Sequence, residues 1–510
     1  MDEGFRAMGV GGSREADEDG VDDETVHHRA APSSGALLRG ESAAPTASSF
    51  AASRPASVLA ANWFESPVSQ QGTVTRLSDR PLVCADVDAL GAKAYVGGEV
   101  SMTAAETASR TDHAVYEVDV KTCKKLRTLY TKTHGHKEWV TKVRCLPDGR
   151  VLSSGMDSLI CLWDARGTRC SALEGHNGSG AFYTLVPIRS RWRGGRRSLR
   201  TFAGVSLRLP LAFNPRPRCL STPLLTPFNS TLTSLCMERP SVSDVAVGAS
   251  GLTAVSAGYD KTLKLWNLAP KGFTARSDRC VGTLHGHKAP VTTLAWGERR
   301  VAKNAEEKKD QDDASGGLGS GDRDGVVMLW DAGSGAAVGR RGGHRGHVTS
   351  LAWIDGGGGG GGAVLLSGGQ DGKVHAWDPR VGGTSPVASV AAHVQKAGAG
   401  AVGDIVQTVS GAVVTAGADG HVAVIDPRAG FAARGKVACG DFVYSLAAIG
   451  PLALAGTGSG GIHVIDIDVT DEPKTLYGLG ANEAAVRCVH ASEDGLFAAG
   501  DDGTCISYAF

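Results

Sequence analysis

The feature that most constrains the fold is a stretch of three short β-type runs enclosed by two dipeptides. It opens at Gly135-His136 and closes at Trp163-Asp164. The runs WVTKVRC, RVLSS and LICLWD lie between them, and the turn sequences Pro-Asp-Gly and Gly-Met-Asp separate the runs. The stretch therefore predicts one small antiparallel sheet, a unit that a repeat architecture can copy.

The same side chains return at the same spacing in later units. A serine lies four residues before an aspartate, and a tryptophan lies six residues after it. This pattern resembles the WD-repeat family, in which each unit is one blade of a β-propeller. The resemblance implies a buried relay in each blade: the aspartate fixes a histidine, the histidine meets the hydroxyl, and the hydroxyl meets the indole N–H. The relay residues expected on this basis are His136, Ser153, Asp157, Trp163, His176, Ser256, Asp260, Trp266, His287, Ser320, Asp324, Trp330, His344, Ser367, Asp371 and Trp377.

Eight units of this kind can be counted along the chain, at about 44 residues each, which agrees with the roughly 40–45 of a WD repeat. The first unit and the last two are degenerate. Because the chain ends after a third strand, the run GTVTRLS near Gly72 is the spare strand that would complete the last unit and close the ring. We expect an all-β propeller over residues 71–510, with eight blades, or seven as the alternative.

Two segments fall outside this repeat pattern. Residues 1–70 are acidic and rich in Ala, Ser, Gly and Pro, so they predict a disordered, low-complexity tail. Residues 180–241 are rich in Pro and Arg and interrupt the third unit. We interpret them as a non-core insertion, either a disordered loop or non-native sequence such as a translated intron, in preference to an RNA-binding or phosphate-binding segment.

Net charge and cysteine usage limit the class of partner and the cellular compartment that we expect. The formal net charge is zero at pH 7, so no basic field favours nucleic acid or an anionic membrane. The 11 cysteines form no CxxC pair, which favours reduced thiols in the cytoplasm or the nucleus and gives no zinc motif. No apolar run approaches the ~20 residues of a membrane span. We expect proteins or peptides as partners, and no metal or cofactor.

A hydrolytic triad is the sharpest alternative for the relay residues. Ser153, His136 and Asp157 have the residue types of a nucleophilic triad. The same set recurs in further units, and a catalytic site has no reason to be copied into every blade. We therefore interpret the set as structural and expect no enzyme activity.

The family resemblance also implies an interaction face. In WD-repeat propellers, the residues just before each relay aspartate and just after each Gly-His surround the central opening. Exposed aromatic, Met and Arg side chains at such places carry much of the binding energy of protein interfaces. The residues expected at this face are Trp139, Met156, Tyr259, Pro290, Arg323, His347, Gln370 and Asp501.

A Trp-Asp-x-Arg motif supplies a more specific alternative. It occurs at Trp163 to Arg166 and at Trp377 to Arg380, with a variant from Ile425 to Arg428. It resembles the motif by which some WD-repeat proteins dock on the adaptor of a cullin–RING ubiquitin ligase. The competing interpretation is that each arginine pairs with its neighbouring aspartate. We expect a protein-interaction scaffold or adaptor, with a ligase substrate receptor docking through Arg166, Arg380 and Arg428 as the alternative.

Overall fold

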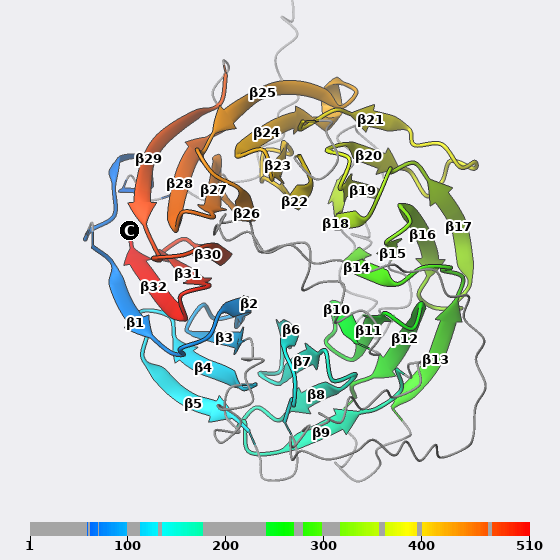
Figure 1. The fold of residues 1–510 in the computed structure, drawn as a ribbon, viewed down its shortest axis with the longest axis horizontal. Helices are drawn as coiled ribbons and strands as arrows, with labels where there is room; N and C mark the ends of the chain where they lie inside the picture. Colours follow the sequence, from blue (N-terminus) through cyan, green and yellow to red (C-terminus); the bar gives the residue numbers. More distant parts are fainter. Residues whose placement is uncertain are drawn as a thin grey trace, which may run out of the picture. The chain divides into compact units, whose positions relative to one another are not determined.

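The computed structural model describes eleven parts of the chain: residues 59, 62–69, 71–98, 113–130, 135–176, 241–269, 279–297, 317–355, 363–394, 400–467 and 472–510. Within residues 55–510, the strands form eight antiparallel sheets of four strands each. Figure 1 shows these sheets arranged as blades around a central opening. The expected eight-bladed β-propeller is confirmed, and the seven-bladed alternative is wrong.

Within each blade the strands follow one another from the innermost to the outermost. The first four blades are β2 (Leu82–Val87), β3 (Lys93–Gly98), β4 (Val115–Asp119), β5 (Lys125–Leu129); β6 (Val140–Cys145), β7 (Val151–Gly155), β8 (Ile160–Trp163), β9 (Cys170–Leu173); β10 (Val242–Val247), β11 (Thr253–Gly258), β12 (Thr262–Asn267), β13 (Cys280–His285); and β14 (Val291–Gly297), β15 (Gly317–Asp322), β16 (Val326–Asp331), β17 (Ala337–Gly342). The last four blades are β18 (Val348–Asp355), β19 (Ala363–Gly369), β20 (Val374–Trp377), β21 (Ala388–Val390); β22 (Val402–Gln407), β23 (Val413–Gly417), β24 (His421–Asp426), β25 (Ala432–Ala438); β26 (Val443–Ile449), β27 (Leu452–Thr457), β28 (Gly461–Asp466), β29 (Lys474–Gly480); and β30 (Val486–Ser492), β31 (Gly495–Gly500), β32 (Thr504–Ala509), β1 (Thr73–Arg76).

The core lies between neighbouring blades, because each sheet buries both of its faces. The signature tryptophan at the end of the third strand packs on the blade before its own. Trp163 joins a cluster with Tyr95 and Val115 of the first blade, and Trp266 joins one with Leu152 and Leu162 of the second. Blades without tryptophan keep this arrangement with Val118, Ile425, Ile465 and Tyr508. Apolar volume at this position, more than the indole itself, is therefore what every blade retains.

The ring closes by pairing segments from opposite ends of the described chain. Strand β1 pairs with β32 in antiparallel register, from Thr73 opposite Ser507 to Arg76 opposite Thr504. The backbone N–H of Leu77 continues the ladder by donating to Gly503 O at 2.9 Å. The expected closure by the GTVTRLS strand is confirmed, and it removes the exposed edge that the last blade would otherwise present.

A short segment before β1 extends this closure. The helix α1 (Asn62–Glu65) places Trp63, which is fully buried, against Phe510. The Trp63 indole N–H donates to Glu493 O at 3.1 Å, and Tyr477 OH donates to Trp63 O at 2.9 Å. Helix α1, with Trp63, belongs to the span assigned to the tail, so ordered structure begins before residue 70. Residues 1–58 lie outside the described part.

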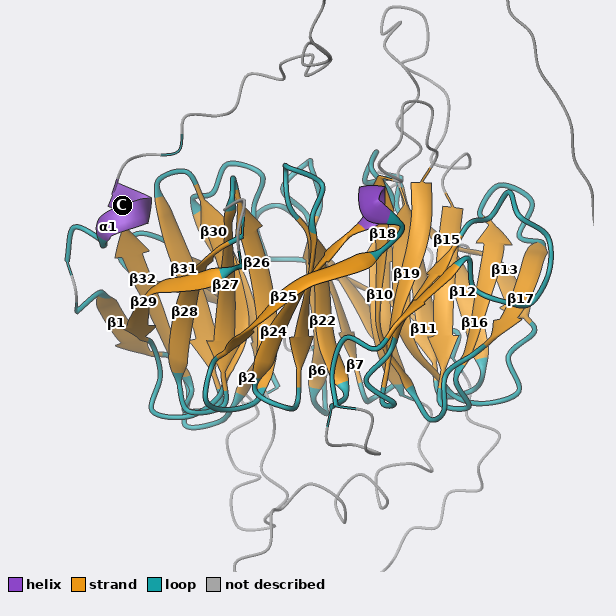
Figure 2. Ribbon diagram, turned by 90° about the horizontal axis from the view of Figure 1, so that it is seen from above, coloured by secondary structure: helices purple, strands orange, loops and turns teal. Residues whose placement is uncertain are grey.

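The proposed insertion also lies outside the described residues, except for Ser241. The described chain stops at His176 and resumes at Ser241, which leads into β10. Strands on the two sides of the gap nevertheless meet in neighbouring blades. Edge-on, the strands run between two faces, each lined by turns (Figure 2). The described residues include no helix with the length and apolar character of a membrane span.

Candidate functional site

The second blade shows how the relay is built. The His136 ring lies between a carboxylate and a hydroxyl, with Nδ1 3.2 Å from Asp157 Oδ1 and Nε2 2.8 Å from Ser153 Oγ. The Trp163 indole N–H donates to the same hydroxyl at 3.0 Å. These side chains are buried, so each hydrogen bond replaces one that water would have made.

The relay recurs with small changes in three other blades. The structure brings His176, Ser256, Asp260 and Trp266 together in the third blade, and His344, Ser367, Asp371 and Trp377 in the fifth, with every contact between 2.7 and 3.0 Å. In the sixth blade, His393 lies 3.0 Å from Asp419 and 2.9 Å from Thr415 Oγ1, while Ile425 replaces the indole. The relay thus persists without its tryptophan.

The fourth blade departs from the expectation. His287 Nδ1 lies 2.8 Å from Asp322 Oδ2, and Asp324, which has the expected spacing, is exposed. The assignment of Asp324 to the relay is therefore wrong. The reason is steric: Asp322 stands where the second blade has Gly155, and a Cβ at Gly155 would lie 2.5 Å from His136 Nδ1 and 2.7 Å from Asp157 Oδ1. A carboxylate that starts at this position reaches the histidine first and displaces the later one.

The relay carboxylates also hold the turns that form one face of the ring. Asp157 Oδ2 accepts the backbone N–H of Lys137 at 2.8 Å, and Asp371 Oδ2 accepts that of Arg345 at 3.0 Å. Burial alone would raise the pKa of Asp157, but the hydrogen bonds from His136 and the backbone outweigh it and lower that pKa. The carboxylate therefore stays ionised and ties the strand entering each blade to the turn within it.

These ties bring most of the expected interaction residues together in pairs. Backbone hydrogen bonds run from Met156 N to Trp139 O at 2.8 Å, from Arg323 N to Pro290 O at 3.1 Å, and from Gln370 N to His347 O at 2.9 Å. Tyr259 and Asp501 make the equivalent bonds to Ser241 and Ala485, each at 2.9 Å. All eight expected residues are half-buried at this face, which we call the interaction face.

An aromatic–arginine cluster lies on the seventh and eighth blades and is formed by Phe442, Tyr444, Arg487 and Asp501. Sequence reasoning predicted Asp501 and missed the other three. The Arg487 guanidinium lies 4.3 Å from the centroid of the Tyr444 ring, and it forms two hydrogen bonds to the Asp501 carboxylate, at 2.8 and 2.7 Å. Phe442 packs edge-on against Tyr444 and is 47% exposed. A signal did exist: Phe442 precedes the inward Val443 as Trp139 precedes Val140, but the seventh unit has Cys439 in place of the relay histidine from which the spacing is counted.

This cluster makes the central opening asymmetric. In the second to fifth blades, a small hydroxyl follows the first inward valine of the innermost strand and bonds to the next blade, as Thr141 does with Val242 O at 2.8 Å and Thr292 does with Val348 O. Tyr444 and Arg487 occupy the same strand position in the seventh and eighth blades. On one side of the opening the innermost strands therefore carry short hydroxyl side chains, and on the other side they carry large side chains.

The adaptor-docking candidates lie on the opposite face. They follow the third strand of their blades, whereas the interaction face contains the turns between second and third strands. Arg380 is held by Asp378, with contacts of 2.7–3.2 Å, and this hydrogen bond lowers the pKa of Asp378. Arg428 lies 3.5 Å from Asp426, and Arg166 is exposed. Two of the three arginines therefore pair with their own aspartate.

A hollow at the ends of the innermost strands also lies on this opposite face. It encloses about 440 Å³ and includes Trp296, Leu351 and Trp353 among its lining residues. The Trp353 indole N–H donates to Ala295 O at 3.1 Å, which fixes the ring across two blades. Both tryptophans lie in Leu-Ala-Trp runs of the sequence. They were not predicted as site residues because they are not at the signature position at the end of a third strand.

Comparison with known proteins agrees with this geometry. The family model described as "WD domain, G-beta repeat" matches residues 124–164, 230–267, 278–331 and 337–378. The chain is similar to the "Ribosome biogenesis protein WDR12 homolog" of Arabidopsis thaliana, with 24% identity over 298 residues, covering 48% of the chain and 65% of that protein. It is also similar to the "CCR4-associated factor 4 homolog" of Candida glabrata, with 28% identity over 145 residues, covering 19% of the chain and 25% of that protein.

The chain therefore spans less than two thirds of the length of these curated relatives. Among solved structures, Sqt1 of Saccharomyces cerevisiae superposes with a TM-score of 0.59 at 10% identity, covering 86% of the chain and 99% of Sqt1. At this identity the likeness shows a shared fold.

Proposed function

The chain is a WD-repeat β-propeller protein, and from this premise we propose that it is a protein-interaction scaffold whose partner docks on the interaction face. Propellers of this family generally serve as protein-interaction scaffolds. The observation that carries the proposal is the aromatic–arginine cluster, in which an exposed Phe442 packs on Tyr444, and Tyr444 and Asp501 together fix Arg487. Side chains held in place before binding lose little conformational freedom when a partner arrives.

The distribution of residue types on this face supports the same proposal. Aromatic and arginine side chains are enriched among the residues that dominate binding energy at interfaces. Trp139 and Met156 in the second blade, and Phe442, Tyr444 and Arg487 in the seventh and eighth, present such groups on both sides of the opening. A partner that spans the opening would contact both groups.

A comparative purification tests the proposal. The full-length wild-type chain, Phe442→Ala and Val338→Ala are each used to capture partners, and bound proteins are quantified. Val338 is 54% exposed on the outer strand β17, so its change removes a similar exposed apolar surface away from the face. We expect a stoichiometric partner to be reduced at least tenfold with Phe442→Ala and retained with Val338→Ala. Equal recovery with both variants would contradict the proposal.

A second and more specific candidate is a substrate receptor of a cullin–RING ubiquitin ligase. Exposure of Arg166 favours it: Asp164 there accepts the backbone N–H groups of Thr168 and Arg169, at 2.7 and 2.9 Å. Arg380, by contrast, is held by Asp378. If this candidate holds, Arg166→Ala abolishes recovery of the adaptor and cullin, while Phe442→Ala does not. Absence of both proteins from the wild-type complex would contradict it.

A further inference from the structure

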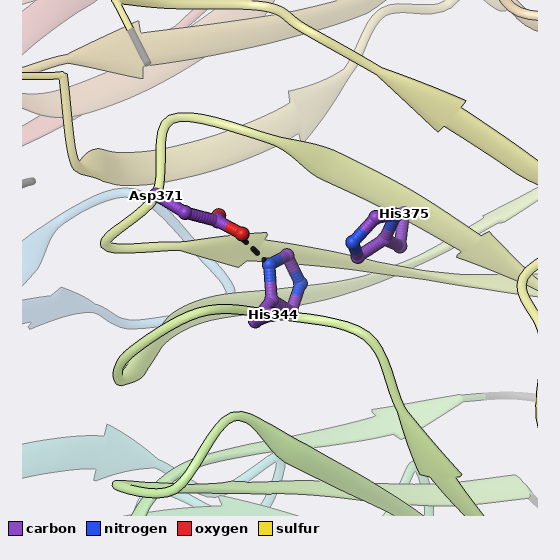
Figure 3. Close-up of side chains that lie close together, drawn as sticks. All are labelled: His344, Asp371 and His375. Atoms are coloured by element: carbon purple, nitrogen blue, oxygen red, sulfur yellow. Dashed lines mark hydrogen bonds and ion pairs between the residues drawn. The ribbon is translucent and has the colours of Figure 1, made fainter. Parts of the chain in front are cut away.

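In the fifth blade, a second and buried histidine packs directly against the relay histidine. His375 lies on β20, two residues before the signature Trp377, and it is 4% exposed. Its ring centroid lies 4.3 Å from that of His344, with the planes tilted by 47°. Figure 3 shows the two imidazoles side by side, with Asp371 on the far side of His344. Two imidazoles and a carboxylate are thereby gathered inside one blade.

His375 has no hydrogen-bond partner for either ring nitrogen among the described residues. A buried polar group left without a partner costs about 1–3 kcal/mol, so native proteins rarely keep one without a reason. The other relay blades avoid the problem with Cys161, Lys264, Met328 and Ala423 at this strand position.

The three side chains have the spacing and chemistry of a metal-ligand set. One ligand atom from each of His344, Asp371 and His375 lies within 4.8 Å of the others, and all three residues are buried. Imidazole nitrogens with one carboxylate suit Zn²⁺, which takes three protein ligands and leaves a fourth position open in many sites. We propose that His344, Asp371 and His375 form a zinc-binding site within the fifth blade, although the sequence carries no zinc motif.

Because the relay shares His344 and Asp371 with the proposed site, zinc binding there would depend on pH. His344 already bonds to Asp371 and Ser367 through its two nitrogens, at 3.0 and 2.7 Å. A metal ion bound to His344 therefore displaces a proton or the Ser367 contact, while it supplies His375 with a partner. Because binding releases a proton or needs neutral imidazoles, zinc affinity falls as the pH falls. Bound zinc stabilises the folded chain, since the unfolded chain does not assemble the three ligands.

Zinc titration of the full-length protein after treatment with a chelator tests the site. The informative variant is His375→Met, because Met328 fills this position in the fourth blade and shows that the fold accepts it. The matched control is His463→Ala, which removes a histidine from the same strand position in the seventh blade, where Ala455 replaces the relay serine. We expect wild type and His463→Ala to bind Zn²⁺ at one more site than His375→Met, or about tenfold more tightly.

Two readouts separate this site from the cysteines. Zinc should raise the melting temperature of wild type and His463→Ala, and leave that of His375→Met unchanged. Cobalt bound at the site should give a visible absorption spectrum without the near-ultraviolet band of thiolate ligation. Equal zinc stoichiometry and affinity in wild type and His375→Met, or a cobalt spectrum dominated by thiolate, would overturn the proposal.

Discussion

Trp63 stacks on Phe510, with ring centroids 3.7 Å apart and planes inclined by 11°. Behind this pair, β1 completes the last blade by pairing with β32. The ring is thus closed twice, once by a backbone ladder and once by an aromatic contact outside it. Both closures use residues that lie before the first complete blade.

Truncation of the aromatic closure should destabilise the whole ring. Trp63→Ala removes a fully buried ring and its hydrogen bond to Glu493, so we expect a loss on the order of 3 kcal/mol in the free energy of unfolding. Phe64→Ala is the matched control, because Phe64 is the exposed aromatic neighbour. Denaturant unfolding measures both. Similar losses for the two variants would show that the Trp63 contact does not hold the closure.

The corrected relay of the fourth blade predicts a large loss of stability at one aspartate and a small loss at the other. Asp322→Ala leaves His287 and two backbone N–H groups of the turn without their acceptor, and should cost about 1–3 kcal/mol. Asp324→Ala changes an exposed carboxylate and should cost less than about 0.5 kcal/mol. Thermal unfolding of both variants checks the order. A larger effect at Asp324 would restore the assignment made from spacing.

The sixth blade should contribute to acid sensitivity. Burial lowers the pKa of His393 below its usual value of 6.5, and Lys436 and His421 lower it further, while Asp419 opposes them. Its folded form thus binds a proton less readily than its unfolded form. The stability it contributes is full above pH 6.5 and is lost as the pH falls from there through the folded pKa.

His393→Gln should therefore reduce the loss of stability on acidification, although it lowers stability at neutral pH. Unfolding free energies of wild type and variant across this pH range give the comparison. A parallel pH dependence in the two proteins would mean that His393 does not titrate on unfolding.

The relay of the third blade indicates that the insertion is dispensable for folding. His176 before it lies 2.9 Å from Asp260 and 2.7 Å from Ser256 after it, so the relay already joins both sides. Deletion of residues 180–241 brings Ser179 to the place of Ser241 and restores the usual spacing to Val242. We expect an unchanged or higher melting temperature. A marked fall would show that the segment supports the fold.

Repeat spacing was sufficient to predict the blade count, the closing strand and the relay in blades two, three and five, because each depends on local pattern. It failed at Asp322, where the outcome depends on which carboxylate reaches His287 first. It failed at Trp63, because one buried ring is hidden in a segment of tail-like composition. The environment of His375 could not be predicted from spacing, because Asp371 is near it in sequence but His344 is not.

Binding and folding should separate on the interaction face, and the proposed scaffold function depends on this separation. Trp139 is half-buried and its carbonyl is tied to Met156, while Val140 fills the core beside it. The most direct test is the dissociation constant of the captured partner for wild type, Trp139→Ala and Phe442→Ala, measured with the melting temperature of each. We predict nearly unchanged melting temperatures and affinity weakened by at least the ~2 kcal/mol of an interface hot spot. Unfolding of Trp139→Ala, or full affinity in both variants, would contradict the claim.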